Sequence, residues 1–269
     1  MAVRSPEKGA SVAQQLRREF PGAVVDVYPL EMGSYESVTG LAGRLAAEFA
    51  PGSNNKRLDI AILNAGIVMP DFVRNKSTGH CEVIQVNYLS TVLLAILLLP
   101  VVSSPPGGKT SPGRLSIVGS GTALAAKIPN RDVRPFLASF DSPEKLKWDA
   151  TERYFSSKAL MHLFLVKLLD YLGDDKYGSD RVVVNIVDPG YTKGSGLHRE
   201  AEGLLSAFLT ASKELTGRTL DHAAWSYVDA VVRKGPESHG CFVMDGEIRP
   251  CVSFFFFFVS CGVMTATNV

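Results

Sequence analysis

Two kinds of apolar pattern alternate along this chain. Segments in which apolar residues recur every three to four positions predict helices, and short apolar runs bounded by Pro, Gly or polar clusters predict strands. The expected helices cover 10–20, 35–49, 80–102, 150–172 and 219–232, and the expected strands cover 23–28, 58–63, 114–118, 181–187 and 240–244. Residues 103–113 predict a loop rich in Pro and Gly, and 129–147 predict a long irregular excursion.

This alternation predicts the fold class. Strands separated by helical segments pair in parallel through right-handed crossovers. The runs LDIAIL (58–63) and VVVNIV (182–187) are apolar on both faces, as buried parallel strands are. We therefore expect an α/β fold with a doubly wound parallel sheet, in which ligands bind at the carboxyl ends of the strands.

Composition narrows the function classes. The chain has 269 residues, 46% of them hydrophobic, and a formal net charge of +1, so it has material for one α/β core and no charge excess that would indicate nucleic acid or an anionic surface. Its four cysteines form no CxxC and predict reduced thiols rather than a metal site. No signal peptide follows Met1, and the apolar run 92–102 is too short to span a bilayer. We expect a cytoplasmic protein with no membrane, nucleic-acid or metal partner.

Tyr154 and Lys158 are the most informative pair. They lie four positions apart in an expected helix, so both side chains project from one face. A nearby ammonium stabilises a phenolate and lowers the phenol pKa, which would let Tyr154 exchange a proton in carbonyl reduction or alcohol oxidation. A surface Tyr and Lys on an amphipathic helix is the alternative explanation, because this spacing is common.

Small and polar residues follow three of the expected strands. Asn64-Ala65-Gly66 follows the strand that ends at 63, Gly119-Ser120-Gly121 the strand that ends at 118, and Asp188-Pro189-Gly190 the strand that ends at 187. Each stretch alone is also compatible with an ordinary turn. Asn87 lies among apolar neighbours in an expected helix, where it is either a functional residue or a core asparagine with satisfied hydrogen bonds.

Together, the order of these features resembles the short-chain dehydrogenase/reductase family. The resemblance runs from about residue 2 to about residue 250, and ERYFSSKAL, LDIAILNAG, VNYLSTVLL and VNIVDPG are most similar to fungal members that reduce ketones in secondary metabolism and to retinol-dehydrogenase-like enzymes. It implies a Rossmann-like fold and an NADP(H)-dependent oxidoreductase that acts on a ketone or secondary alcohol. Family members often pair, so a homo-oligomer is also implied.

The resemblance also implies residue roles. Tyr154 would be the general acid/base, Lys158 would lower its pKa and bind the nicotinamide ribose, Ser120 would hold the substrate oxygen, and Asn87 would support a water that relays protons. Asn64, Ala65 and Gly66 would line the adenosine side of the cofactor.

Other positions match the family pattern less closely. Pro189 and Gly190 would lie beside the nicotinamide amide. The family's Thr four residues after this Gly is Gly194 here, so Thr192 is the substitute. Arg4 follows the position of the family's second strand and suits a 2′-phosphate, hence NADP rather than NAD, although a solvated Arg is the competing explanation. Glu31 stands where the family usually has Asp beside the adenine.

The family's first strand and its glycine-rich phosphate-binding turn have no match in this sequence. We expect one domain over residues 1–250 that is incomplete at its N-terminus, with 251–269 as an atypical Phe-rich tail. Two alternatives therefore stand beside the reductase. One is a non-catalytic remnant. The other is a redox-neutral acid–base enzyme, such as a dehydratase or cyclase, that uses Tyr154, Lys158 and Ser120 without nucleotide.

Overall fold

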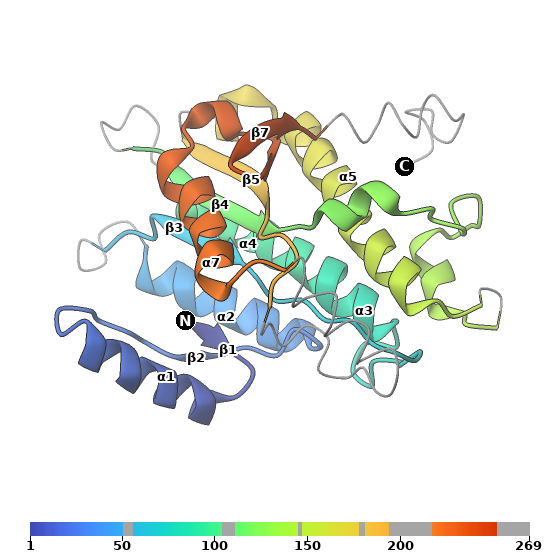
Figure 1. The fold of residues 1–269 in the computed structure, drawn as a ribbon, viewed down its shortest axis with the longest axis horizontal. Coiled ribbons are helices and arrows are strands. Elements are labelled where there is room, and N and C mark those ends of the chain that lie inside the picture. The colour runs from blue at the N-terminus through green and yellow to red at the C-terminus, as the bar shows by residue number, and fades with distance from the viewer. Residues whose placement is uncertain (51–55, 104–110, 145–146, 178–180, 194–216, 252–269) are drawn as a thin grey trace.

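The computed structural model describes residues 1–50, 56–103, 111–144, 147–177, 181–193 and 217–251 (Figure 1). Its main sheet has five strands in the order β3-β4-β5-β6-β7. Their bounds are Ile60–Leu63, Gly113–Val118, Val182–Asp188, Cys241–Met244 and Glu247–Pro250. The first four pair in parallel and β7 pairs antiparallel with β6. The predicted parallel α/β sheet is confirmed.

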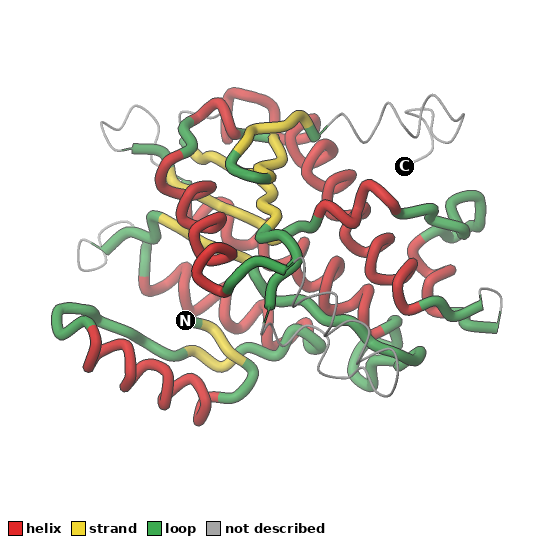
Figure 2. The backbone as a smooth tube through the Cα atoms, viewed as in Figure 1, coloured by secondary structure: helices red, strands yellow, loops and turns green. Residues whose placement is uncertain are grey.

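Helices pack on both faces of this sheet (Figure 2). Ile117 and Ile186 pack in one core cluster with residues of α4 (Thr91–Val102) and α5 (Ala150–Tyr177). Val118 and Val187, the next residue on each strand, pack instead with Ala230, which lies just after α7 (Leu220–Val228) in the π-helical segment η5 (Asp229–Arg233). Because successive strand residues face opposite sides, both faces are buried, which is why β4 and β5 are mostly apolar.

The N-terminal part forms a separate small unit. β1 (Ala2–Val3) and β2 (Tyr28–Pro29) pair in parallel as a two-stranded sheet. α1 (Pro6–Glu19) connects them, and α2 (Tyr35–Glu48) follows β2 and packs against α4. Among the described residues, β3 pairs only with β4. Its outer residues Ile60 and Ile62 are each 39% exposed, so the sheet ends at β3 with apolar side chains facing solvent.

The strands of the structure differ from the expected ones in two places. The strand expected over 23–28 is wrong for most of its length, because β2 begins only at Tyr28, and Val24 is 89% exposed with no sheet face to pack on. β7 was not expected, although its signal is present. Asp245 and Gly246 have φ values of 58° and 74°, which is the backbone of a tight Asp-Gly hairpin turn between β6 and β7.

The helix expected over 80–102 is one continuous helix made of α3 (Glu82–Ile84), the π-helical η1 (Gln85–Ser90) and α4. Its 21 residues are long and apolar enough to cross a membrane by composition, but 61% of the most apolar window is buried inside the protein, as in a core helix. The excursion expected over 129–147 contains, in its described residues, turns and the short 3-10 segment η3 (Leu137–Asp141).

A core truncation tests this packing. Leu115 in β4 is fully buried in the cluster between the sheet, α4 and α5. We expect Leu115→Ala to lower the free energy of unfolding by about 2–5 kcal/mol, because it removes apolar burial and leaves a cavity. Denaturant unfolding followed by circular dichroism measures this. Val24→Ala at the exposed position is the control and should change stability by less than about 0.5 kcal/mol. Equal effects of the two changes would contradict the assigned core.

Candidate active site

Three neighbouring strands end at the same edge of the sheet, and each end carries a polar group. The register aligns Leu63 with Ile117, and Val118 with Val187. Asn64 therefore follows β3, Ser120 follows β4, and Asp188 ends β5 along one line, with strands spaced about 4.8 Å apart. α5 packs against the segment that follows β4, and Tyr154 lies in the second turn of this helix. The strand-end residues predicted from sequence are thus brought together.

Ser120 and Tyr154 meet directly. The Ser120 hydroxyl lies within interaction range of the Tyr154 hydroxyl and acts to lower the pKa of that phenol. The same Ser120 oxygen accepts hydrogen bonds from the Thr122 backbone N–H (3.2 Å) and the Thr122 hydroxyl (2.9 Å). These contacts orient the Ser120 oxygen and leave its own hydrogen for Tyr154. A carbonyl oxygen placed beside both hydroxyls would receive two donors.

Lys158 lies one turn further along α5 and is buried. Its Nζ is 5.7 Å from the centroid of the Tyr154 ring and donates a 2.8 Å hydrogen bond to the Val118 carbonyl oxygen at the end of β4. The ammonium therefore fastens α5 to the strand end and faces the aromatic ring.

The expected acidification of Tyr154 is wrong for this structure. Burial raises the pKa of Tyr154, and the negative charge of Asp188 and the Tyr227 phenol raise it further, while the Ser120 hydrogen bond opposes them. Burial lowers the pKa of Lys158 to about 8, against the stabilising charge of Asp188. Loss of hydration thus outweighs the pairing of opposite charges, because both groups lie largely out of water. Tyr154 is held as the protonated phenol.

Asn87 has the hydrogen-bond partners that a buried asparagine needs. Its Oδ1 accepts from the Ile67 N–H (2.8 Å), and its Nδ2 donates to the Ile67 carbonyl (2.9 Å) and to the Ser157 hydroxyl (3.0 Å). It therefore ties the turn after β3 to α5. It lies in the π-helical η1, and such bulges are frequent at functional sites. The water relay implied by the resemblance remains a prediction.

Gly66 lies at the centre of this arrangement. A Cβ on Gly66 would stand 3.5 Å from Asn87 Oδ1 and 3.6 Å from Lys158 Nζ, so the Asn64-Ala65-Gly66 turn runs directly beside both. Asn64 and Ala65 are exposed. A ligand that lies along this turn would reach Lys158.

The turn after β5 is held by its own contacts. Gly190 has φ = 74°, a conformation that favours glycine, and follows Pro189. The Thr192 hydroxyl donates to the Gly190 carbonyl (3.0 Å), and the Arg218 side chain lies against Gly190. Thr192 is thus placed beside the turn as expected. Gly194 lies outside the described residues.

Arg4 and Glu31 lie in the N-terminal unit. Arg4 is exposed at the end of β1, next to Ser5, the residue that caps α1. Glu31 follows β2, is exposed, and accepts a 2.9 Å hydrogen bond from the Gly33 N–H. Among the contacts described, neither forms a hydrogen bond or ion pair with Ser120, Tyr154 or Lys158. The structure therefore does not join them to the catalytic group.

Sequence reasoning missed two residues that share this edge. Asp188 affects the pKa of Tyr154, Lys158 and Tyr227, and the Tyr227 hydroxyl donates a 2.9 Å hydrogen bond to Asn64 Oδ1 from α7. The sequence analysis named Asp188 only as part of the turn after the strand, although an acidic side chain at a strand end could have marked it as a site residue. Tyr227 had none, because only the packing of α7 on the strands brings it to Asn64.

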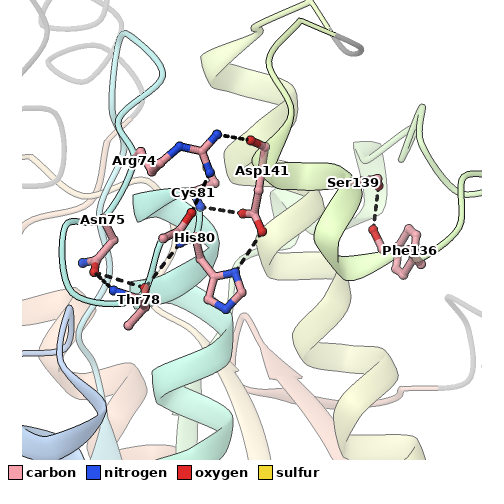
Figure 3. Close-up of polar contacts among 9 residues, drawn as sticks. Arg74, Asn75, Thr78, His80, Cys81, Phe136, Ser139 and Asp141 are labelled. Atoms are coloured by element: carbon pink, nitrogen blue, oxygen red, sulfur yellow. Dashed lines mark hydrogen bonds and ion pairs between the residues drawn. The ribbon is translucent and has the colours of Figure 1, made fainter.

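The excursion between Ser120 and Tyr154 is fastened by Asp141 (Figure 3). The Asp141 carboxylate contacts His80 Nδ1 (2.8 Å) and accepts from the Cys81 N–H (2.7 Å), and its carbonyl accepts from Arg74 (2.7 Å). Cys81 caps the helix that carries Asn87. The excursion is thereby tied to that helix, which fixes where α5 begins.

The described residues fit one end of a nicotinamide dinucleotide. The hydroxyl and ammonium groups beside the Asn64–Gly66 turn suit a ribose and a nicotinamide. The pyrophosphate end is not matched, because none of the described helices of eight or more residues is opened by a turn with two glycines. The described residues thus match the nicotinamide end, and the described part of the chain provides no comparable seat for the phosphates.

Comparison with curated proteins finds fungal relatives. The chain is 48% identical over 252 residues to the short chain dehydrogenase/reductase mfmJ of Annulohypoxylon moriforme, covering 93% of this chain and 69% of that protein. It is 37% identical over 258 residues to the short chain dehydrogenase opdN of Penicillium oxalicum, covering 93% and 79%. No family model matches the chain.

Comparison with solved structures supports the same fold. A short chain dehydrogenase/reductase from Burkholderia phymatum in complex with NAD aligns with a TM-score of 0.58 at 15% identity, covering 97% of this chain and 80% of that one. An alcohol dehydrogenase from Thermococcus sibiricus complexed with 5-hydroxy-NADP aligns with a TM-score of 0.56 at 16% identity, covering 90% and 83%.

The burial of Lys158 has a measurable linkage to stability. Its pKa falls from 10.5 to about 8 in the folded protein, so between these values the folded state binds fewer protons than the unfolded state. The contribution of Lys158 to the free energy of unfolding therefore rises as pH increases from 8 to 10. We expect the wild type to gain about 1–3 kcal/mol over this range relative to Lys158→Met, measured by denaturant unfolding at each pH.

Lys167→Met, at a partly exposed lysine of the same helix, is the matched control and should follow the wild type. A parallel pH dependence of the wild type and Lys158→Met would show that this ammonium is not desolvated on folding.

Proposed function

Because the chain belongs to the short-chain dehydrogenase/reductase family, we propose that it is an NADP-dependent oxidoreductase that transfers a hydride between the nicotinamide and a ketone or secondary alcohol. The observation that carries this proposal is the gathering of Ser120, Tyr154 and Lys158 at one strand edge, where Ser120 acts on the Tyr154 phenol and the Lys158 ammonium lies 5.7 Å from its ring centre. When bound, the nicotinamide supplies the hydride chemistry, and the residues of this chain orient the substrate and move the proton.

Each residue has one task in this proposal. Ser120 and Tyr154 hold the substrate oxygen, and Tyr154 gives it a proton as the carbonyl carbon is reduced. Lys158 holds the nicotinamide ribose, and Asn87 keeps the Asn64–Gly66 turn beside it. The raised pKa of Tyr154 keeps the phenol protonated before the reaction, as the proton donor in ketone reduction must be.

The finer parts of the proposal rest on the relatives and on sequence position. The fungal relatives support a role in secondary metabolism. Arg4 supports NADP over NAD, because a guanidinium pairs with a 2′-phosphate. A cytoplasmic location, no membrane or nucleic-acid partner, and a homo-oligomer complete the proposal.

Removal of one hydroxyl tests the chemistry. We expect Tyr154→Phe to lower kcat for NADPH-dependent reduction of a ketone by about 10²–10⁴-fold, because the proton donor is lost while the ring still packs. NADPH absorbance measures the rate, and an unchanged melting temperature shows that the fold is kept. Tyr171→Phe, at an exposed position of α5, is the control and should keep the wild-type rate. Full activity in Tyr154→Phe would refute the assignment.

Nucleotide preference is tested separately by isothermal titration with NADPH and NADH. We expect Arg4→Gln to weaken NADPH binding by about tenfold or more and to leave NADH binding unchanged, since only NADPH presents a 2′-phosphate. Arg18→Gln, at the exposed end of α1, is the control and should change neither. A folded wild-type protein that binds neither nucleotide would contradict the proposed function.

A further inference from the structure

Asp188 is a carboxylate at the catalytic edge that the proposed reduction does not use. It is the last residue of β5, and the register that aligns Val118 with Val187 places it beside Gly119, one residue before Ser120. Side chains alternate along a strand, so Asp188 lies on the same side as Ile186. Ile186 packs with Met161 and Leu165 of α5, which is the side from which Tyr154 approaches.

The two oxygens of Asp188 have different surroundings. Oδ1 accepts a 2.9 Å hydrogen bond from the Gly190 N–H, which holds the side chain in place. Oδ2 has no hydrogen-bond partner among the described contacts. It lies 3.1 Å from where a Cβ of Gly121 would stand, and Met244 Sδ lies 3.3 Å from the same point, so a side chain at Gly121 would crowd Oδ2.

Asp188 also borders a cavity of about 300 Å³, whose lining does not include Ser120, Gly121 or Tyr154. Asp188 lines the cavity together with residues of α7 and of the β6–β7 turn, among them Trp225, His222 and Gly246. The neighbouring Asp245 is occupied by an ion pair with Arg218, and Asp229 by one with Lys234 (3.2 Å). Of these three cavity-lining carboxylates, Asp188 alone forms no ion pair among the described contacts.

Asp188 is a proton acceptor, and the hydroxyl groups near it are proton donors. Burial raises the pKa of both Tyr154 and Tyr227, and the charge of Asp188 raises each further, so the phenols stay protonated. Ser120 supplies a further hydroxyl next to Tyr154. Environments that separate the protonation states of neighbouring groups create an acid and a base in one site. A ketone with its oxygen at Ser120 and Tyr154 would direct its adjacent carbon toward Asp188.

We propose that Asp188 is a general base that removes a proton from the carbon next to the carbonyl, so that the site interconverts a ketone and its enol without nucleotide. The C–H bond breaks and its proton passes to Asp188 Oδ2. The electron pair forms the C=C bond, and the carbonyl oxygen takes a proton from Tyr154. Return of both protons restores the ketone and the enzyme, so the cycle is redox-neutral. This inference rests on the ketone-binding part of the proposed function.

The test is solvent deuterium exchange into 2-tetralone, a bicyclic aromatic ketone, in D₂O with the full chain and no nucleotide. We expect the protein to speed loss of the α-hydrogen signals in proton NMR about a hundredfold over buffer. Asp188→Asn keeps an oxygen for the Gly190 N–H and should return the rate to that of buffer. Asp221→Asn, at an exposed position of α7, is the control and should keep the wild-type rate.

Exchange at the buffer rate with the wild type, or an unchanged rate in Asp188→Asn, would overturn the inference. NADPH oxidation with the same ketone is measured in parallel to separate the two proposals. Exchange without reduction leaves Asp188 as the base and refutes the reductase. Reduction without exchange leaves the reductase and refutes the base.

Discussion

Parallel pairing of β3, β4 and β5 is the constraint on which the site depends. Backbone hydrogen bonds in a fixed register bring residues that are far apart in the sequence, Asn64, Ser120 and Asp188, to one edge within a few strand spacings. The apolar strands bury both faces, and a one-residue slip would turn every side chain to the opposite face. The catalytic edge is thus a consequence of how the core packs.

Loss of water at this edge decides the charge states. Lys158 is buried and donates a hydrogen bond to the Val118 carbonyl at the end of β4, and the Tyr154 phenol is also buried. Burial stabilises the neutral form of each group relative to its charged form. The phenol therefore stays protonated, and the ammonium loses its proton more readily. The Lys158 ammonium lies 5.7 Å from the centre of the Tyr154 ring, and burial outweighs the influences that lower the pKa of this phenol. In the proposed reaction Tyr154 is therefore the proton donor.

The N-terminal part of the chain, where the 2′-phosphate contact is proposed, is separate from the part that holds Tyr154 and Lys158. β1 and β2 form a sheet of their own, β3 leaves Ile60 and Ile62 partly exposed, and the described helices have no two-glycine turn for a pyrophosphate. The catalytic half is densely held by Asn87, Lys158 and Asp141, whereas Arg4 and Glu31 have no described link to it. The proposed proton-transfer residues and the proposed 2′-phosphate contact therefore lie in parts of the chain that no described contact links.

Sequence alone determined the alternation of helices and strands, the parallel sheet, and the pair Tyr154 and Lys158, because periodicity and i, i+4 spacing are local properties of a chain. It also indicated Ser120 and Asn87, through polar residues at strand ends and in an apolar helix. Tertiary structure decided the rest. It shortened the strand expected over 23–28, which has no sheet face to pack on, and it added β7 through the Asp245-Gly246 turn. It also placed Asp188 and Tyr227 beside Tyr154 and raised the pKa of that phenol, since desolvation and through-space charge depend on which distant segments pack together.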